Sequence, residues 1–298
     1  MQHRMIGLGS KSVTEIIELF SKISEDKSVL ILNRAGLYQK SGKELAETFA
    51  KIPLQIKEVH LGFNLLHQQT AETLSLFLNA FPEHVKKLIL NKNDLHLFSA
   101  NDLAQILSSL SKGIDTLSLQ ENGLHNKTGD ELAIIVAAIS KNVFFLDLSG
   151  NFLGQRLPED QHNLNVDEKL KKMFTAFGKN ITSLDLSSNN LNEISLEILE
   201  KLKDSAPYVQ KLYLSEYEIN HMSLERRQAL GAIFPNLTEI LAQDFKTGHF
   251  EKRELAEFGL SCSLFKASAC FFPNQAKNID TNNEQYTNKN ENESKTPH

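Results

Sequence analysis

Tryptophan is absent from this 298-residue chain, and cysteine and proline are scarce, with 2 and 7 residues. Two cysteines, Cys262 and Cys270, cannot build a disulfide framework and suit a reducing compartment. No apolar run approaches the roughly 20 residues that span a bilayer, and Met1–Gly9 lacks the apolar core of a Sec-type signal peptide. The formal charge is only −5, without the basic footprint of a nucleic-acid binder. We expect a globular protein with no membrane and no nucleic-acid partner.

An internal repeat is the main feature that the sequence does have. The pattern L-x-x-L-x-L-x-x-N-x-L, in which L is any aliphatic residue, starts at positions 56, 85, 114, 143 and 181, and weaker copies start at 27, 209 and 237. The intervals are 29, 29, 29, 29, 38, 28 and 28 residues, and chance similarity would not keep such a period. The full copies carry Asn64, Asn93, Asn122, Asn151 and Asn189 at the asparagine position. The copy that starts at 209 has Tyr217 there instead.

Each repeat combines the periodicities of a strand and a helix. The alternation L-x-L predicts a short strand with every second side chain in the core. Apolar residues also recur 11, 7 and 4 positions before each start, as Ile16, Phe20 and Ile23 do before position 27, and this spacing marks one helix face. Ser205 and Arg226 are exceptions. The asparagine amide has donors and acceptors, so it can satisfy backbone groups of adjacent repeats.

These motifs resemble the leucine-rich repeat family, in the class of 28–29 residues typified by ribonuclease inhibitor, over roughly residues 12–245. The resemblance implies an α/β solenoid, or horseshoe, of about eight repeats with parallel strands on the concave face and helices on the convex face. Because helices are wider than the strand spacing of about 4.8 Å, such a stack must curve.

The repeat register also sets the expected organisation of the chain. We expect an N-terminal capping helix within 1–26, repeats over 27–245, a C-terminal cap over 246–272 with a helix at Glu251–Phe258, and a disordered tail over 273–298. The long 38-residue interval predicts a polar insertion at about 154–166, on the rim where a strand hands over to a helix. Its role is left open.

The exposed strand positions of such a fold form a wall on its concave side. Large apolar or aromatic groups on this otherwise polar wall favour protein contact. The alternative is that they pack on one another or on rim loops. The candidate partner-binding residues are Phe145, Tyr213, Phe63, Ile89, Asp147, Asp185, His60, Lys87, Glu121 and Lys211.

The chain shows no catalytic or metal-binding motif, and we expect no cofactor. It has no H-E-x-x-H and no paired C-x-x-C. Asp147 and Asp185 occupy equivalent places in consecutive repeats and could lie side by side. A glycosidase pair would also need a pocket and one raised pKa, and we expect an open ribbon to offer neither. We therefore interpret the pair as an acidic spot for a basic group on a partner.

The dimensions of such a face favour a protein partner. Eight strands at roughly 4.8 Å span about 34 Å, which suits an interface of roughly 800 Å² per partner. A small molecule would need an enclosed cavity of roughly 300–1,000 Å³, which we do not expect on a ribbon.

The repeat style, the Asn- and Lys-rich composition and the glutamates Glu284, Glu291 and Glu293 near the C-terminus resemble leucine-rich-repeat effectors of Legionella-type intracellular bacteria. That resemblance implies type IV-like secretion without a signal peptide into the host cytoplasm. We expect a non-enzymatic module, a monomer when alone, that binds one host protein or another bacterial effector enzyme in a 1:1 complex and blocks its active site, as ribonuclease inhibitor does.

The alternative function is a GTPase-activating or scaffolding protein that acts on a host signalling component. Activators of Ran share this repeat class and carry an acidic tail. The tail of this chain has three lysines against four acidic residues, so it is not strongly acidic.

Overall fold

The structure, a computed structural model, describes residues 1–155, 166–244 and 246–260. The chain divides into a unit of Met1–Ser261 and a unit of Cys262–His298, of which the first carries all the elements below. Most of the expected insertion (156–165), the C-terminal cap beyond residue 260, the two cysteines and the tail 273–298 lie outside the described residues.

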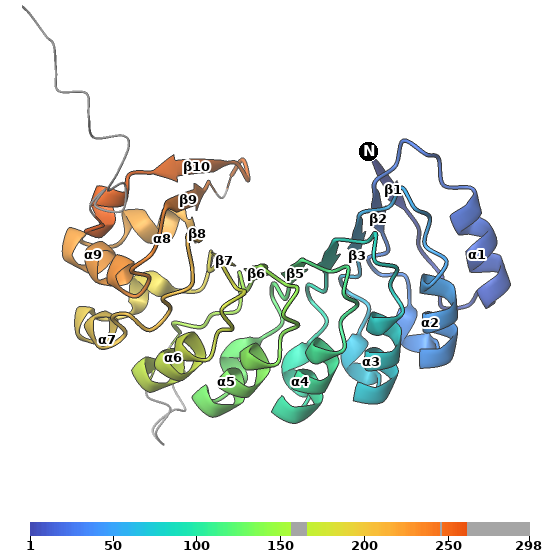
Figure 1. The fold of residues 1–298 in the computed structure, drawn as a ribbon, viewed down its shortest axis with the longest axis horizontal. Coiled ribbons are helices and arrows are strands. Elements are labelled where there is room, and N and C mark those ends of the chain that lie inside the picture. Colours follow the sequence, from blue (N-terminus) through green and yellow to red (C-terminus); the bar gives the residue numbers. More distant parts are fainter. Residues whose placement is uncertain (156–165, 245, 261–298) are drawn as a thin grey trace, which may run out of the picture. The chain divides into compact units, whose positions relative to one another are not determined.

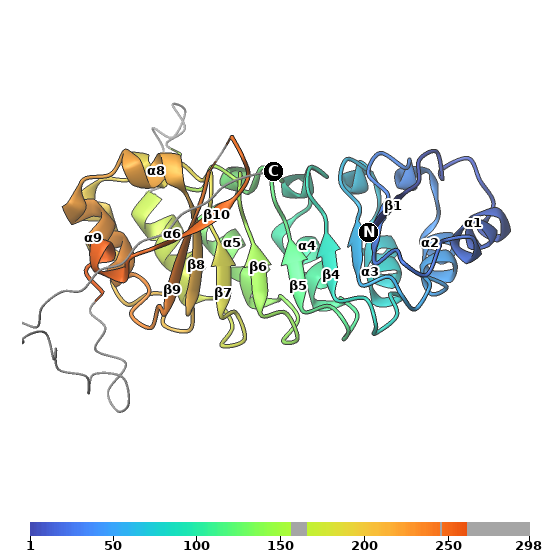
Figure 2. The same cartoon turned by 90° about the horizontal axis from the view of Figure 1, so that it is seen from above.

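One sheet of ten strands runs through the described part of this unit in sequence order, from β1 to β10. The strands are β1 (Gln2–Arg4), β2 (Val29–Ile31), β3 (Glu58–His60), β4 (Lys87–Ile89), β5 (Thr116–Ser118), β6 (Phe145–Asp147), β7 (Ser183–Asp185), β8 (Lys211–Ser215), β9 (Glu239–Gln243) and β10 (Phe250–Arg253). Neighbours pair in parallel from β1 to β9, and β10 pairs with β9 in antiparallel fashion. The strands line the inner side of a curved ribbon (Figures 1 and 2).

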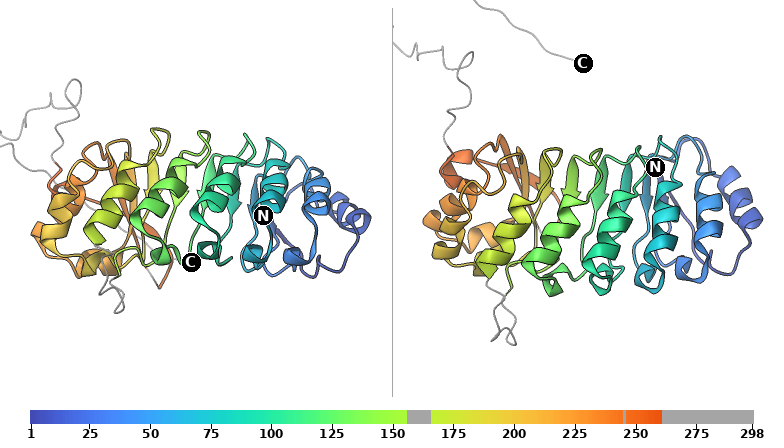
Figure 3. Two further views of the ribbon diagram at one scale, coloured as in Figure 1. Left: turned by 90° about the horizontal axis from the view of Figure 1, so that it is seen from below. Right: turned by 60° about the horizontal axis from the view of Figure 1, so that its bottom comes forward.

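Helices cover the outer side of this sheet. The α-helices are α1 (Val13–Ser21), α2 (Gly42–Phe49), α3 (Ala71–Asn79), α4 (Ala100–Ser108), α5 (Gly129–Ala137), α6 (Val166–Thr175), α7 (Leu196–Lys201), α8 (Glu216–Asn220) and α9 (Leu224–Ala232). Short 3₁₀ helices are η1 (Leu37–Gln39), η2 (Leu66–Gln68), η3 (Leu95–Leu97), η4 (Leu124–Asn126), η5 (Leu191–Glu193) and η6 (Leu255–Phe258). Most of the α-helices lie side by side on the convex face, whereas α8 lies at one rim (Figures 2 and 3). The predicted leucine-rich repeat architecture is confirmed.

The core follows the predicted helix and strand periodicities. In the repeat that contains α4, Leu103, Leu107 and Leu110 are buried at the −11, −7 and −4 positions. The strand position Leu117 is buried with them. Hydrophobic burial of this kind supplies most of the driving force for folding, and each repeat obtains it only from its neighbours.

Serine or threonine residues begin the outer helices at a 29-residue interval. The side chains of Ser12, Ser41, Thr70, Ser99 and Thr128 each accept a hydrogen bond from a backbone N–H in the first turn of α1 to α5. Such caps satisfy donors that have no partner within the helix, at a gain of about 1 kcal/mol each. These caps start each helix the same number of residues before the strand that follows it.

A ladder of buried asparagines joins the turns that follow the strands. The Oδ1 atom of Asn93 accepts from the backbone N–H of Asn64 at 2.8 Å, and its Nδ2 donates to the carbonyls of Leu61 and Leu90, both at 3.0 Å. Asn122 and equivalent residues repeat this bonding in the next turns. Buried polar groups must be paired to avoid a desolvation cost, and these amides pair across two repeats at once. The predicted role of the asparagine is confirmed.

A glutamate replaces asparagine at the C-terminal end of this ladder. Tyr217, which stands at the asparagine position in the sequence pattern, is 60% exposed, whereas Glu218 is 4% exposed. The Oε1 and Oε2 atoms of Glu218 accept from the backbone N–H groups of Leu191 and Ser188 at 3.0 and 2.9 Å. Burial raises the pKa of Glu218, although the backbone N–H groups around it favour the carboxylate.

The two ends of the ribbon differ from the sequence-based expectation. The expected N-terminal cap within 1–26 contains β1 as well as α1, and β1 extends the sheet parallel to β2. Leu8, which follows β1, is fully buried. The predicted helix at Glu251–Phe258 is wrong, because this stretch divides between β10 and η6. Pairing with the open edge of β9 satisfies backbone groups that a helix would have left exposed.

The ladder predicts a large stability difference between two asparagines of neighbouring repeats. Replacement Asn122→Ala removes acceptors for two backbone N–H groups and donors for two carbonyls in the core. Unpaired buried groups cost about 1–3 kcal/mol each, so we expect a loss of about 3 kcal/mol or more in urea unfolding. The control is Asn101→Ala, on the exposed side of α4, which should change stability by less than about 0.5 kcal/mol. Equal effects of the two replacements would contradict this role of the ladder.

Candidate protein-binding face

The concave face consists of the strand side chains that point away from the core. Two rows run across it, because each three-residue strand has one outward residue on either side of its buried centre. In the first row Phe145 is in register with Ser183, which is in register with Lys211. In the second row the register is Asp147, Asp185, Tyr213. The strands that carry these rows can be followed across the sheet in Figure 2.

The N-terminal half of this face is polar and paired within itself. The Nε2 atom of His60 lies 2.6 Å from Oε1 of Glu58, and Nζ of Lys87 lies 3.2 Å from the same oxygen. The hydrogen bond with His60 lowers the pKa of Glu58. Ile89 is in register with His60 and is half-buried. The predicted residues His60 and Lys87 are thus brought together by a third side chain.

A charged stack lies beside the concave face, at the turns. Arg34, Phe63, Lys92 and Glu121 hold equivalent places in successive repeats, each with a left-handed backbone. The Phe63 ring lies between the two cations, with its centroid 4.5 Å from Cζ of Arg34 and 5.1 Å from Nζ of Lys92. Lys92 also pairs with Glu121 at 2.7 Å. Phe63 and Glu121 therefore have partners within the chain, although part of the Phe63 ring remains exposed.

Three aromatic rings form a row on the C-terminal half of the concave face. The centroids of Phe145 and Tyr213 are 5.2 Å apart at 86°, and those of Tyr213 and Phe250 are 5.2 Å apart at 89°. Phe145 reaches Tyr213 across β7, whose first-row residue is the small Ser183. Phe145 and Tyr213 are half-buried, and Phe250 is 41% exposed. The rings pack on one another and still present apolar surface to solvent. We call Phe145, Tyr213 and Phe250 the aromatic row.

Phe250 was not among the residues predicted from the sequence. It belongs to β10, which lies outside the repeat period and returns antiparallel along β9. Its neighbours in the sequence are charged, so Phe250 is not part of an apolar periodicity that could have marked it. Its position five residues beyond the last repeat was a weak indication, because a chain that turns back there would return to the sheet.

The two carboxyl groups beside the aromatic row differ in environment. Asp147 accepts hydrogen bonds from Oγ of Ser118 at 2.6 Å and from the N–H of Ser149 at 2.8 Å. Asp185 is 8% exposed and accepts from the N–H of Ser187 at 2.8 Å. Burial, with the nearby charge of Asp147 second, raises the pKa of Asp185 to about 7. The expectation that this ribbon offers no raised pKa is therefore wrong at Asp185.

Unlike Asp147 and Asp185, the other concave carboxylates on β2 to β9 form salt bridges. Glu58 pairs with Lys87, and Glu239 pairs with Lys211 at 2.7 Å. Glu239 also holds the pKa of Lys211 above its usual value. Within the described residues, no basic side chain forms a salt bridge with Asp147 or Asp185. No basic side chain of the described residues therefore uses the Coulomb attraction that the pair could offer to a cation.

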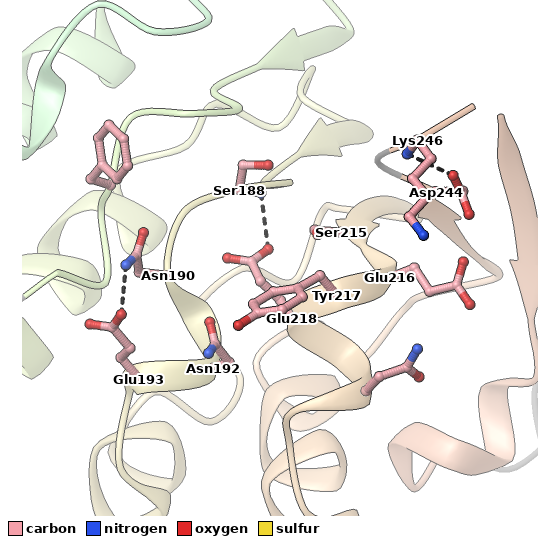
Figure 4. Close-up of a pocket in the computed structure, with 12 residues that line it drawn as sticks. Ser188, Asn190, Asn192, Glu193, Ser215, Glu216, Tyr217, Glu218, Asp244 and Lys246 are labelled. Carbon is pink, nitrogen blue, oxygen red and sulfur yellow. Dashed lines mark hydrogen bonds between the residues drawn. The ribbon is translucent and has the colours of Figure 1, made fainter. Parts of the chain in front are cut away.

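A cavity of about 780 Å³ opens on the rim next to the end of the asparagine ladder. Ser188, Asn190, Tyr217 and Glu218 line it, together with Asp244 from the turn before β10 (Figure 4). Its volume falls within the range of small-molecule sites, but it is open to solvent and is not the enclosed cavity that such a site would need. The sequence pattern gave no sign of it because α8 and the β9–β10 turn depart from the repeat.

Two other kinds of site are absent from the described ranges. Among residues 1–155, 166–244 and 246–260, no cluster of three or more His, Cys, Asp or Glu side chains is arranged to hold a metal ion. Over the same ranges, none of the helices has the length and apolar character needed to cross a bilayer.

The phased copies, the parallel sheet and the outer helices define a leucine-rich repeat protein, and the chain belongs to that family. Among solved structures it is similar to the leucine-rich repeat-containing protein LegL7 from Legionella pneumophila, with 30% sequence identity, a TM-score of 0.67 and 86% of each chain covered. This similarity confirms the resemblance to Legionella proteins. Horseshoes of this kind serve as scaffolds for protein–protein interactions through their concave surfaces.

A second similarity is weaker. The complex of Rad7 and Elc1 in yeast matches with 13% identity and a TM-score of 0.37, over 83% of this chain and 78% of that one. No protein-family model matches the chain, and no curated protein sequence does.

The buried carboxyl of Asp185 predicts a pH-dependent stability difference. Its pKa rises from an ordinary value of 3.8 to about 7 on folding, so the folded state binds more protons between these values. Stability should therefore fall as pH rises from about 4 to 7. Replacement Asp185→Asn keeps an acceptor for Ser187 and removes the charge. We expect it to raise stability at pH 8 by about 1 kcal/mol or more and to leave stability at pH 4 nearly unchanged, as measured by urea unfolding. A destabilised variant at pH 8 would contradict this view of Asp185.

Proposed function

We propose that this protein is a non-enzymatic binding module that holds one protein partner in its concave face, in a 1:1 complex. The partner is a host protein or another effector enzyme of the same bacterium. A partner whose active site faces the concave surface is blocked by steric exclusion, and the module then acts as an inhibitor.

The aromatic row is the observation that carries this proposal. Partly exposed rings on a surface that is otherwise polar are typical of interface hot spots, where a few residues supply most of the binding energy. Phe145 and Tyr213 are also held by packing on each other, so little side-chain entropy is lost when a partner covers them. The predicted residues His60, Lys87 and Glu121 then form a paired, charged surround, in which Ile89 and Phe63 are the apolar members.

The similarity to LegL7 supports a role as a secreted bacterial effector. That protein comes from Legionella pneumophila, and the glutamate-bearing C-terminal segment of this chain suits a type IV-like route into the host cytoplasm. Translocation of a reporter fused to the full chain, compared with a fusion that lacks residues 273–298, tests this part of the proposal.

The binding proposal predicts affinity losses from single changes in the aromatic row. The partner would first be captured with the full chain from host lysate and from the producing bacterium, and its affinity measured by calorimetry. We expect Phe145→Ala and Tyr213→Ala each to lose about 2 kcal/mol or more of binding free energy, because truncation of a hot-spot ring exposes its pocket to water.

The matched control is Ile134→Ala, which removes an exposed apolar side chain from α5 on the convex face. It should leave affinity within about 0.5 kcal/mol of the unmodified protein. Loss of binding in this control, with no loss in the two aromatic variants, would contradict the concave-face proposal. Acceleration of GTP hydrolysis by a captured small GTPase would instead favour the GTPase-activating alternative.

A further inference from the structure

We propose that the concave face receives an arginine side chain of the protein partner, whose guanidinium group lies against the aromatic row and pairs with Asp147 and Asp185. This inference rests on the proposed function and names the chemistry that the partner must present. A guanidinium is the expected group because both the carboxyl pair and the rings bind one.

The fold itself does not require a carboxyl group at position 185. In the described part of the chain, the backbone contact of this side chain is a hydrogen bond from the N–H of Ser187, at 2.8 Å, and an asparagine oxygen would accept it equally well. A buried charge without a counter-ion costs stability. The Asp185 carboxyl destabilises the fold, and an amide could make its hydrogen bond to Ser187. A carboxyl group at this position is therefore best explained by an interaction with another molecule.

Charge complementarity indicates the sign of the missing partner group. The titratable side chains that face Asp185 are Asp147 from β6, Tyr213 from β8 and Glu218 from α8. Lys211 is in register with Ser183 in the neighbouring row, and its Nζ lies 5.3 Å from the Tyr213 ring centroid and 2.7 Å from Oε2 of Glu239, which pairs with it. The environment is therefore short of positive charge, and a cation from a partner would meet two carboxyl groups that form no salt bridge in the described part of the chain.

The neighbouring rings favour guanidinium over ammonium. Tyr213 is in register with Asp185, and Phe145 lies two residues before Asp147 on the same strand. Guanidinium is planar, stacks on aromatic faces and donates two parallel hydrogen bonds to a carboxylate. An ammonium group could supply the charge but not this planar fit. One arginine would thus use both features of the C-terminal half of the face.

Protonation of Asp185 couples this contact to pH. Its pKa of about 7 in the free protein means that the carboxyl is largely neutral at pH 5.5 and largely charged at pH 8. A bound guanidinium favours the charged form, so binding should release a proton and strengthen as pH rises through this range.

A first experiment needs no partner. The full chain is titrated with N-acetyl-arginine methylamide and with the isosteric, uncharged citrulline analogue, and the side-chain carboxyl signals of Asp147 and Asp185 are followed by NMR at pH 8. We expect the arginine probe to bind about tenfold more tightly than the citrulline probe and to lower the pKa of Asp185. Equal effects of the two probes would overturn the proposal.

A second experiment uses the partner captured in the binding test. We expect Asp185→Asn to weaken its binding about tenfold at pH 8 and much less at pH 5.5. The matched control is Glu197→Gln, which removes a carboxylate from the exposed face of α7 in the same repeat and should change affinity less than twofold. Loss of affinity in Phe145→Ala with full affinity in Asp185→Asn at pH 8 would reject the arginine contact and leave the proposed function standing. Full affinity in both variants would reject the proposed function as well.

Discussion

The asparagine ladder is the interaction on which the rest of this structure depends. A turn that reverses the chain inside a core leaves backbone groups without partners, and their desolvation would prevent burial. The amides of Asn64, Asn93 and Asn122 each satisfy donors and acceptors in two consecutive turns, so no repeat is complete without the next. The same bonding continues across the 38-residue interval, where Oδ1 of Asn189 accepts from the N–H of Asn151 at 3.1 Å. Where the pattern ends, the carboxylate of Glu218 accepts the same kind of backbone hydrogen bond.

A backbone held in this way does not depend on the identity of the outward strand side chains. These side chains affect neither the ladder nor the core, so they are available for function. The two halves of the concave face use this freedom differently. Glu58 and Lys87 neutralise each other in the N-terminal half. In the C-terminal half, aromatic rings lie next to carboxyl groups that form no salt bridge in the described residues. Carboxyl groups without a counter-ion lower the stability of the fold, but together with the rings they are suited to bind a partner.

Most of the fold could be predicted because the ladder and the core are local and periodic. The residue offsets alone placed Leu107 on the inner helix face and Leu117 in the sheet, and both are buried. The ends could not be predicted, since β1 has the polar sequence Gln-His-Arg and β10 pairs antiparallel outside the repeat. For the site, the register predicted that Asp147 and Asp185 would be neighbours. It could not predict the burial of Asp185, the contact of Phe250 with Tyr213 or the role of Glu218, because each depends on side chains that meet across non-equivalent positions.

The central claim is that the concave surface of this ribbon holds a protein partner. Site-specific photocrosslinking tests it most directly. A benzoylphenylalanine is placed at Thr116, whose half-buried side chain is in register with Phe145, or at Leu76 on the exposed side of α3. Irradiation of the complex should crosslink the partner through position 116 and not through position 76. Crosslinking through position 76 alone would place the partner on the convex helices and contradict the account.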